Sequence, residues 1–317
     1  MRVMVASVDY GGRPHFSTWV ARAYRRLGCD VVVVGPGCGL DNAPDGYVAP
    51  VYEQPQFRFG CQGGRMGLGQ VIQSTGPVDL AVMIDTGNDW SVINDGSAPY
   101  AMVWRETNTS ESPRIFSAAN GAPVFYSMCG EGKYPPTPQM HFWPFAVDRE
   151  MFTKPAGNHK DREFGFCYTG RERGNGTWSS ILRILSSHGV NGHCRQYING
   201  YQEYADLLGK SLTTYAVDGR YVGSRGIEAM LAGAVTFWQS GPATSQMGFD
   251  YGNNCFQLAV SICPTTGEYL PSPTNIEEMA DLAKQPKRWN EASLRGQALI
   301  RSRHTYEHRA WQIADTL

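Results

Sequence analysis

The sequence predicts an α/β protein in which two Rossmann-like domains with parallel sheets face a cleft. Three observations lead to this prediction. Short apolar runs rich in β-branched residues alternate with stretches of helical spacing. The alternation occurs twice, before and after the proline- and aromatic-rich passage HFWPFAVDREMF at 141–152. Polar residues follow the strands, where ligands of open α/β sheets bind.

Length, charge and cysteine spacing narrow the class of protein. The 317 residues suit two domains of roughly 150 residues each. A net charge of -1 gives no overall field that would gather nucleic acid or anionic lipid, although a local basic groove stays open. The eight cysteines form no CxxC pair, which argues against structural zinc and against a disulfide scaffold. With no signal-like or membrane-spanning apolar run, we expect a soluble, cytoplasmic protein.

The first series opens with a strand at Val3 to Ser7, followed by a glycine turn, a helical stripe and the valine run 31–34. Strand, helix and strand form a βαβ unit with a right-handed crossover, so the sheet is parallel. The apolar stripe of the helix consists of Phe16, Trp19, Val20, Ala23, Tyr24 and Leu27. Further strands are predicted at Leu80 to Ile84, Tyr100 to Trp104 and Pro123 to Tyr126.

The second series begins with a strand at Phe164 to Tyr168 and a glycine-rich loop at 169–177. A helix follows, with its apolar stripe at Trp178, Ile181, Leu182 and Leu185. Later strands are predicted at Cys194 to Ile198, Leu212 to Ala216 and Ala234 to Trp238. The chain closes on a helical pattern at Tyr306, Ala310, Ile313 and Leu317, and a linker near 144–155 separates the two series.

Two glycine-containing loops follow strands and suit anions. Gly11 and Gly12 lie where backbone amides and a helix start can meet an anion or a sugar hydroxyl; the alternative is a tight strand-to-helix turn. Arg171 and Arg173 lie among glycines, and guanidinium groups bind phosphate oxygens in a fork; the alternative is a solvated charged turn. Neither GxGxxG nor GxxxxGK[ST] is present after these strands, which disfavours a dinucleotide fold and a P-loop.

The segment GSRGIEAMLAGAVTFW at 223–238 is the strongest candidate for a binding site. We expect a loop at 223–226 and a helix from Ile227, so that Ser224, Arg225 and Gly226 lie at a helix N-terminus able to bind an anion. Glu228 in the first turn would accept two hydrogen bonds from a ribose diol. The alternative makes Glu228 a partner of the helix dipole and Arg225 a surface charge.

Four segments, in order, resemble glycosyltransferases of the GT-B fold, group 1 type, which include the spore-maturation glycosyltransferase-like proteins. They are the turn at Gly11 and Gly12, the run Trp143 to Asp148 with Phe152, the run Arg225 to Ala234, and the ending His304 to Ala310. The resemblance covers nearly the whole chain and is specific in its second half.

The resemblance implies transfer of a sugar from a nucleoside-diphosphate sugar to an acceptor hydroxyl, with retention. Residues 149–300 would bind the donor, with Glu228 on the ribose and Arg171 and Arg225 near the diphosphate. Residues 1–148 would form the acceptor side, and a helix at 301–317 would cross back to them. Such enzymes need no metal for the leaving group, and the sequence has no DxD pair, so we expect no metal and no cofactor; helix N-termini and cations would stabilise the leaving group.

The sequence departs from the family at one place and leaves the base open. Related enzymes often carry a glutamate eight positions before the one at 228, where this chain has Arg220; Asp218 is nearby but out of register. The contacts to the donor sugar are therefore open. For a base or electrostatic partner in the first domain the candidates are Asp9, His15, Asp85 and Glu106.

The acceptor is open among a glycan, a protein, a metabolite and a modified DNA base. The run Phe57 to Arg65 mixes aromatic residues, arginines and glycines that could stack on sugars or bases, or form a mobile loop. A glycosyltransferase acting on hydroxymethylated phage DNA is thus one alternative. A catalytically silent nucleotide-sugar-binding module is another, and a nicotinamide oxidoreductase is disfavoured by the missing fingerprint.

Overall fold

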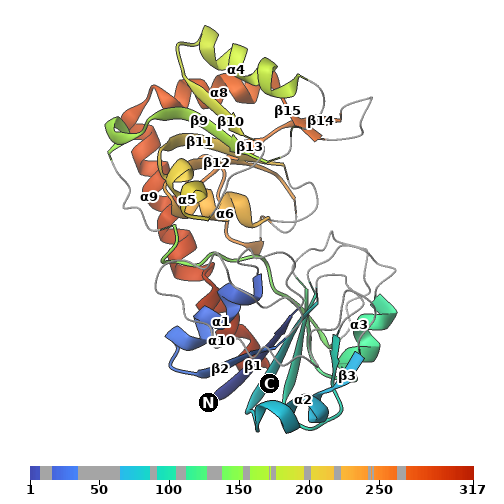
Figure 1. Ribbon diagram of the computed structural model, residues 1–317. Coiled ribbons are helices and arrows are strands. Elements are labelled where there is room, and N and C mark those ends of the chain that lie inside the picture. Colours follow the sequence, from blue (N-terminus) through green and yellow to red (C-terminus); the bar gives the residue numbers. More distant parts are fainter. Residues whose placement is uncertain are drawn as a thin grey trace. The chain divides into compact units, whose positions relative to one another are not determined.

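The computed structural model describes two compact units of the chain (Figure 1). Unit 1 combines Met1–Pro144 with Tyr306–Leu317, and unit 2 is Phe145–Thr305. The described residues are 1–7, 16–34, 65–85, 91–104, 112–126, 138–152, 158–170, 172, 176–195, 201–217, 223–241, 244, 246–262 and 269–317.

Unit 1 is built on a six-stranded parallel sheet of order β2-β1-β4-β6-β7-β8. Its strands are β1 (Arg2–Ser7), β2 (Asp30–Val34), β4 (Leu80–Asp85), β6 (Tyr100–Trp104), β7 (Val124–Tyr126) and β8 (Met140–Phe142). A short parallel pair, β3 (Arg65–Gly67) and β5 (Ser91–Ile93), lies outside this sheet. The inner strands are apolar on both faces, as expected of a parallel sheet covered by helices on both sides.

Within the described part of unit 1, four helices cover this sheet. They are α1 (Phe16–Arg26), α2 (Leu68–Thr75), α3 (Ser112–Ala119) and α10 (Tyr306–Thr316). Helices α2 and α3 supply buried residues to one core cluster, and α1 and α10 pack against each other side by side (Figure 1). Polar contacts join α10 to the rest of unit 1. They include the ion pair Arg26 Nε to Glu307 Oε1 at 2.5 Å, and the bonds from Trp143 Nε1 to the Arg309 carbonyl and from Arg309 Nε to the Pro144 carbonyl.

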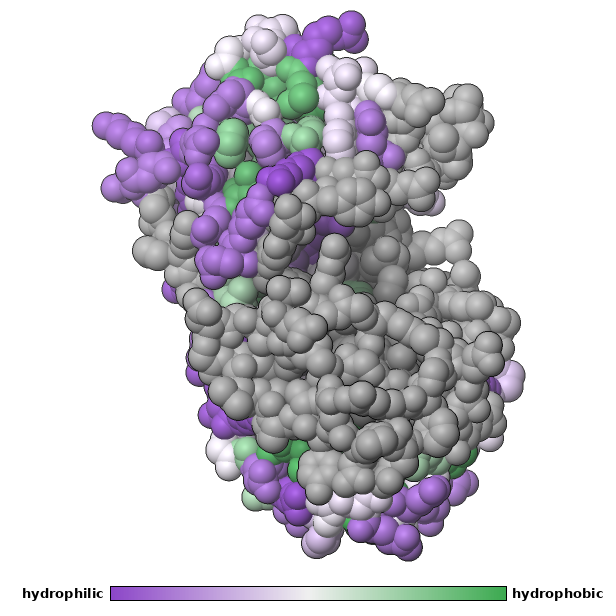
Figure 2. Space-filling model, in the orientation of Figure 1, coloured by the Kyte–Doolittle hydropathy of each residue, from purple (hydrophilic) through white to green (hydrophobic). Residues whose placement is uncertain are grey.

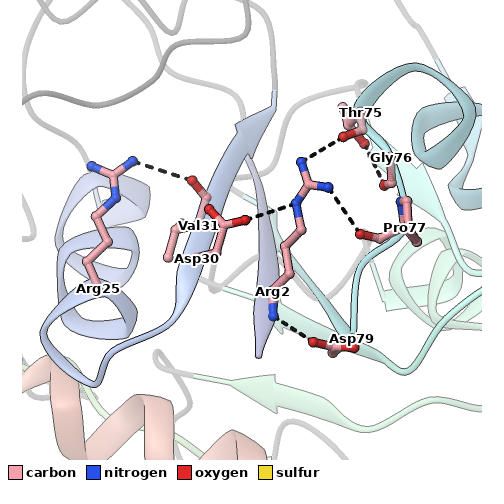
Figure 3. Close-up of polar contacts among 8 residues, drawn as sticks. All are labelled: Arg2, Arg25, Asp30, Val31, Thr75, Gly76, Pro77 and Asp79. Atoms are coloured by element: carbon pink, nitrogen blue, oxygen red, sulfur yellow. Dashed lines mark hydrogen bonds and ion pairs between the residues drawn. The ribbon is translucent and has the colours of Figure 1, made fainter.

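Arg2 ties three parts of unit 1 together (Figure 3). Its Nη2 donates to the Thr75 carbonyl at 2.8 Å and its Nη1 to the Pro77 carbonyl at 3.4 Å, so it satisfies carbonyls at and just beyond the end of α2. Its Nε lies 3.3 Å from Asp30 Oδ2 on β2. Gly76 between these carbonyls has φ +86°, and a Cβ there would lie 2.8 Å from Arg2 Nη1.

The substitution Arg2→Met is expected to lower the free energy of unfolding by about 1–2 kcal/mol, because it removes charge-assisted bonds to two carbonyls and a partly exposed ion pair. Urea denaturation followed by circular dichroism measures the change. The same substitution at the exposed Arg301 of unit 2 should shift the free energy by less than about 0.5 kcal/mol. Equal effects at both positions would show that the Arg2 contacts contribute nothing.

Unit 2 is built on a five-stranded parallel sheet of order β10-β9-β11-β12-β13. Its strands are β9 (Phe164–Thr169), β10 (Gly192–Arg195), β11 (Ser211–Ala216), β12 (Val235–Gln239) and β13 (Phe256–Leu258). The polar residues of β11 are buried and paired, as Thr213 Oγ1 donates to the Gly165 carbonyl at 2.7 Å. A small antiparallel pair, β14 (Val260–Ile262) and β15 (Tyr269–Pro271), follows.

Helices cover both faces of the second sheet. Helices α4 and α8 lie on one face and α5 and α6 on the other (Figure 1). The helices that the structure describes in unit 2 are α4 (Thr177–Ser187), α5 (Tyr201–Gly209), α6 (Ser224–Leu231), α8 (Pro273–Ala283) and α9 (Pro286–Arg303), with a 3-10 turn η3 (His159–Asp161). On the face seen in Figure 2, hydrophilic side chains prevail over the described surface of unit 2, with a small hydrophobic group near α4, whose Trp178, Leu182 and Ile184 are partly buried.

The α/β class and the two parallel sheets predicted from the sequence are confirmed. Several predicted boundaries differ from the observed ones by one to three residues. Strand β7 begins at Val124, because Pro123 has no amide proton for the ladder. Strand β10 begins at Gly192, which pairs with Phe166 of β9, two residues before the predicted start. Helix α6 begins at Ser224 rather than at Ile227.

Two predicted loops, the glycine turn at 9–12 and the run 57–64, lie outside the described residues. Within the residues that the structure describes, no helix has the length and apolarity that a bilayer crossing requires.

Candidate functional site

The candidate site of unit 2 lies beside β9, where the order of the sheet reverses. Strand β9 lies between β10 and β11, so the connections from β9 and β11 leave in opposite directions. Such a switch point leaves a crevice beyond the carboxyl ends of the strands, where open α/β sheets bind ligands. Strand β9 ends at Thr169 at this place, Gly170 follows it, and helix α6 follows β11.

Helix α6 presents its N-terminus through glycine. Gly223 occupies the N-cap position with extended backbone (φ -75°, ψ 156°), and it has no side chain with which to cap the helix. Because the helix begins three residues earlier than predicted, Glu228 lies in the second turn, and the first turn holds no acidic residue. The helix dipole acts within the first turn, so the reading of Glu228 as a dipole partner loses its basis.

Glu228 is a buried carboxyl group, with only 8% of the residue exposed. The Tyr204 hydroxyl of α5 donates to its Oε2 at 2.8 Å. Burial raises the pKa of Glu228 to about 7, while the bond from Tyr204, the charge of Arg225 and the Ser224 hydroxyl lower this pKa. Burial thus disfavours the ionised form of this carboxyl group, which lies beside the switch point of the sheet. A residue with such a perturbed pKa at such a place is a candidate for ligand binding.

Arg225 lies along the end of β9. Its guanidinium carbon is 5.5 Å from the centroid of the Tyr168 ring, and its Nη1 is 3.4 Å from the Tyr168 hydroxyl. The Tyr168 ring stacks on Tyr215 at 4.5 Å. A Cβ at Gly170 would lie 2.7 Å from Arg225 Nη1, and the φ of Gly170 is +153°. Glycine at 170 is therefore what allows the guanidinium to reach the end of β9.

Gly226 serves packing. A Cβ at this position would lie 2.3 Å from Cζ2 of Trp238 and 3.0 Å from the Cβ of Ala216. Helix α6 therefore approaches strands β11 and β12 as closely as it does because residue 226 has no side chain. This close approach sets the depth at which Arg225 and Glu228 sit beside the sheet.

Tyr204 is the residue of this cluster that sequence reasoning missed. It lies on α5, a helix for which no prediction was made, and its ring meets the Phe152 ring edge-on at 5.8 Å. The signal was present, because Tyr204, Leu207 and Leu208 have the spacing of one helical face. The hydrogen bond between Tyr204 and Glu228 could not be predicted from local spacing, because 24 positions separate the two residues.

The glycine-rich loop after β9 holds one described acidic residue. Glu172 Oε1 accepts from the Trp178 backbone N–H at 3.1 Å, so it caps the N-terminus of α4. The Ser224 hydroxyl hydrogen-bonds to Glu228, and the charge of Arg225 acts on the same carboxyl group. The backbone of Asp85 ends β4, where it pairs with Trp104 of β6, and its side chain lies outside the described part. The other candidates lie outside the described residues: Asp9, Gly11, Gly12, His15, Glu106, Arg171 and Arg173, together with Asp218 and Arg220.

No protein-family model and no curated protein matches this chain. Solved structures match it over nearly its whole length. A glycosyltransferase from Rickettsia africae has a TM-score of 0.61 at 8% identity, over 99% of this chain and 97% of that one. An alpha-glucosyltransferase in complex with UDP-glucose and DNA containing an abasic site has a TM-score of 0.63 at 8% identity, over 100% and 99%.

A third similar structure is HepE from Anabaena in complex with UDP and glucose, with a TM-score of 0.55 at 11% identity, over 99% and 98% of the two chains. At identities of 8 to 11% the likeness is one of fold. The predicted fold class is confirmed by these neighbours. The chain shares the GT-B fold of these glycosyltransferases, and helices α5 and α6 of its second unit carry Tyr204, Arg225 and Glu228.

Proposed function

We propose that this protein is a glycosyltransferase that moves a sugar from a nucleoside-diphosphate sugar to an acceptor hydroxyl. The observation that carries the proposal is the buried Glu228 carboxyl, held by Tyr204 beside Arg225 in the second Rossmann-like unit. A carboxylate there can accept two hydroxyl hydrogen bonds, which a ribose diol offers. The fold neighbours in complex with UDP or UDP-glucose support the same class of donor.

In this proposal unit 2 binds the donor and unit 1 receives the acceptor. Glu228 accepts from the ribose, and Arg225 with the N-terminus of α6 faces the diphosphate, where the positive end of the helix dipole stabilises the departing charge. Ser224 and Gly226 supply amides of the first turn of α6. The proposed donor site also includes Arg171, Arg173, Gly11 and Gly12. Asp9, His15, Asp85 and Glu106 remain candidates for the acceptor-side base or electrostatic partner.

Several finer points belong to the same proposal. They are the spore-maturation-like subtype, retention at the transferred carbon, catalysis without a metal or cofactor, and a cytoplasmic location. The subtype, retention and independence of metal or cofactor rest on the motifs that carry the resemblance, and the location rests on the apolar patterning of the sequence. Arg225 and the N-terminus of α6, whose N-cap Gly223 has no side chain, are positive groups of the protein that could stabilise the leaving group. Their presence supports the proposal of catalysis without a metal.

A modified DNA base is the second candidate acceptor. The observation in its favour is the likeness to the alpha-glucosyltransferase solved with DNA, including a 13-mer containing an HMU base, at a TM-score of 0.60. Incubating the protein with UDP-glucose and a duplex containing 5-hydroxymethylated pyrimidines tests it by mass spectrometry. A mass gain of one hexose supports a DNA acceptor, and an unchanged mass with transfer to glycans or metabolites removes it.

The central test is the substitution Glu228→Gln, which keeps the shape and one acceptor oxygen. We expect thermal-shift titration to find that UDP or another nucleoside diphosphate stabilises the wild-type protein, and that Glu228→Gln weakens this binding about tenfold or more through the loss of a charged hydrogen bond. Glu163→Gln, at an exposed residue that pairs with Lys210, is the matched control and should bind as the wild type does.

The stability of Glu228→Gln, measured against pH, shows whether a loss of nucleotide binding comes from a damaged fold. The folded-state pKa of Glu228 lies above its unfolded value, so the wild-type protein loses stability as pH rises from about 4.5 to about 7. Glutamine does not titrate. We expect Glu228→Gln to be more stable than wild type at pH 8, by up to about 3 kcal/mol, and closer to it at pH 5. A variant that is destabilised and still binds nucleotide with full affinity would contradict the proposed function.

A further inference from the structure

Tyr204 lies on α5 and Glu228 on α6, and a side-chain hydrogen bond joins the two residues. The hydroxyl of Tyr204 lies 2.8 Å from Oε2 of Glu228. Glu228 is 8% exposed as a whole residue, so little water reaches its carboxyl group. Among the described residues, the charged or titratable groups that act on this carboxyl are Tyr204 from α5 and Arg225 from α6, and the Ser224 hydroxyl also donates to it.

An aromatic contact also holds the Tyr204 ring. Phe152, at the start of unit 2, meets it edge-on with the ring centroids 5.8 Å apart. Phe152 is 2% exposed, so the ring contact is part of the core. Asp148 holds the turn that precedes Phe152 by accepting from the backbone N–H groups of Glu150 and Met151. The hydroxyl of Tyr204 is therefore presented to Glu228 by a ring with a fixed position.

We propose that Tyr204 is a positioning residue for nucleotide recognition: it fixes the plane of the Glu228 carboxylate so that the carboxylate can accept both hydroxyls of a ribose. The inference rests on the proposed function of Glu228. A carboxylate that accepts two hydroxyls must hold one orientation, because two hydrogen bonds have to be aligned at once. A carboxylate that rotates freely is aligned with only one hydroxyl at a time. It therefore binds 2′-deoxyribose, which offers one hydroxyl, nearly as well as ribose, which offers two, and the discrimination between the two sugars falls.

Tyr204 also assists the ionised form. Its hydrogen bond lowers the pKa of Glu228 against the larger, opposite effect of burial. Removing the hydroxyl therefore raises this pKa further above 7, and a larger fraction of the carboxyl is neutral near neutral pH. A neutral carboxyl keeps one good acceptor oxygen, so nucleotide binding by a variant without the hydroxyl should recover as pH rises toward 9.

The test compares the wild-type protein with Tyr204→Phe by calorimetric titration with UDP and 2′-deoxy-UDP, and with the ADP and GDP pairs, at pH 7 and pH 9. We expect the wild type to bind the ribonucleotide at least about tenfold more tightly than its 2′-deoxy form. In Tyr204→Phe this ratio should fall to about threefold or less at pH 7 and recover in part at pH 9. Tyr100→Phe removes a buried hydroxyl of unit 1 that bonds to the Val92 carbonyl, and should leave the ratio unchanged.

The outcomes separate the inference from the function on which it rests. If Tyr204→Phe keeps the full ratio at both pH values while Glu228→Gln loses it, the positioning role is wrong and the proposed site stands. If no ribonucleotide binds the wild type more tightly than its 2′-deoxy form, both are wrong. Phe152→Leu is the second variant, because it keeps the hydroxyl and loosens the ring; we expect a smaller loss of the ratio, and an unchanged ratio in both variants would overturn the inference.

Discussion

Replacing Gly226 with alanine is expected to lower the free energy of unfolding of unit 2 by about 3 kcal/mol. The added Cβ would lie 2.3 Å from Cζ2 and 2.4 Å from Cη2 of Trp238, whose ring is fully buried and packs on Phe249. Alanine favours a helix interior by about 1 kcal/mol over glycine, so the clash has to exceed that gain. Chemical denaturation followed by tryptophan fluorescence measures the difference.

Two control experiments test whether the clash with Trp238 causes this loss of stability. Gly241→Ala places a Cβ in open space in the same unit and should leave stability within about 0.5 kcal/mol of wild type. Trp238→Phe removes the two indole atoms that clash, so in that background Gly226→Ala should cost at least about 1.5 kcal/mol less than in the wild type. Additive costs, or a stable Gly226→Ala protein, would show that glycine is not needed at 226 for packing.

Arg162→Met is expected to destabilise unit 2 by about 2–4 kcal/mol, since it leaves buried carbonyls without a charged donor. Nη1 of Arg162 donates to the carbonyls of Gly209 and Ala232, which end helices α5 and α6. Its guanidinium also lies 5.3 Å from the centroid of the Trp289 ring, and burial lowers its pKa to about 10, so it stays charged near neutral pH. A cation at the C-termini of two helices also interacts favourably with both dipoles.

The matched control is Arg288→Met, which removes another arginine placed over an aromatic ring, at 5.0 Å from the Phe256 centroid. Arg288 is exposed and bonds to no helix end among the described contacts, so we expect a loss below about 1 kcal/mol. Urea denaturation of both variants measures the pair. Equal losses would mean that the ring contact, and not the two carbonyls, accounts for the role of Arg162.

Local sequence patterns sufficed for the strands with buried apolar runs. Val31 to Val34 and Leu80 to Ile84 were predicted as strands and form β2 and β4, because continuous β-branched and apolar runs fit only a covered parallel sheet. Strand β8 was not predicted. Its Met140, His141 and Phe142 are half buried at the edge of the sheet, and three residues carry too weak a periodicity to be read.

The candidate site shows where local reasoning stops. Two glycines at 223 and 226 lower the helix propensity of that segment, which is why its helix was predicted to begin at Ile227. The contact with Trp238 requires glycine within the helix, so tertiary packing overrides propensity. Arg225 and Glu228 could be singled out from their types and spacing. Tyr204 could not be linked to them, because the hydrogen bond joins helices that only the folded sheet brings together.

The contribution of α10 to unit 1 has a consequence for the order of events during synthesis. Residues 306 to 317 complete unit 1, yet they leave the ribosome after every residue of unit 2. Until then, α1 lacks the helix that covers it, and Arg26 and Trp143 lack their partners Glu307 and Arg309. Unit 2 is continuous and can fold as soon as it emerges. The part of the protein that is made first is thus the part that is finished last.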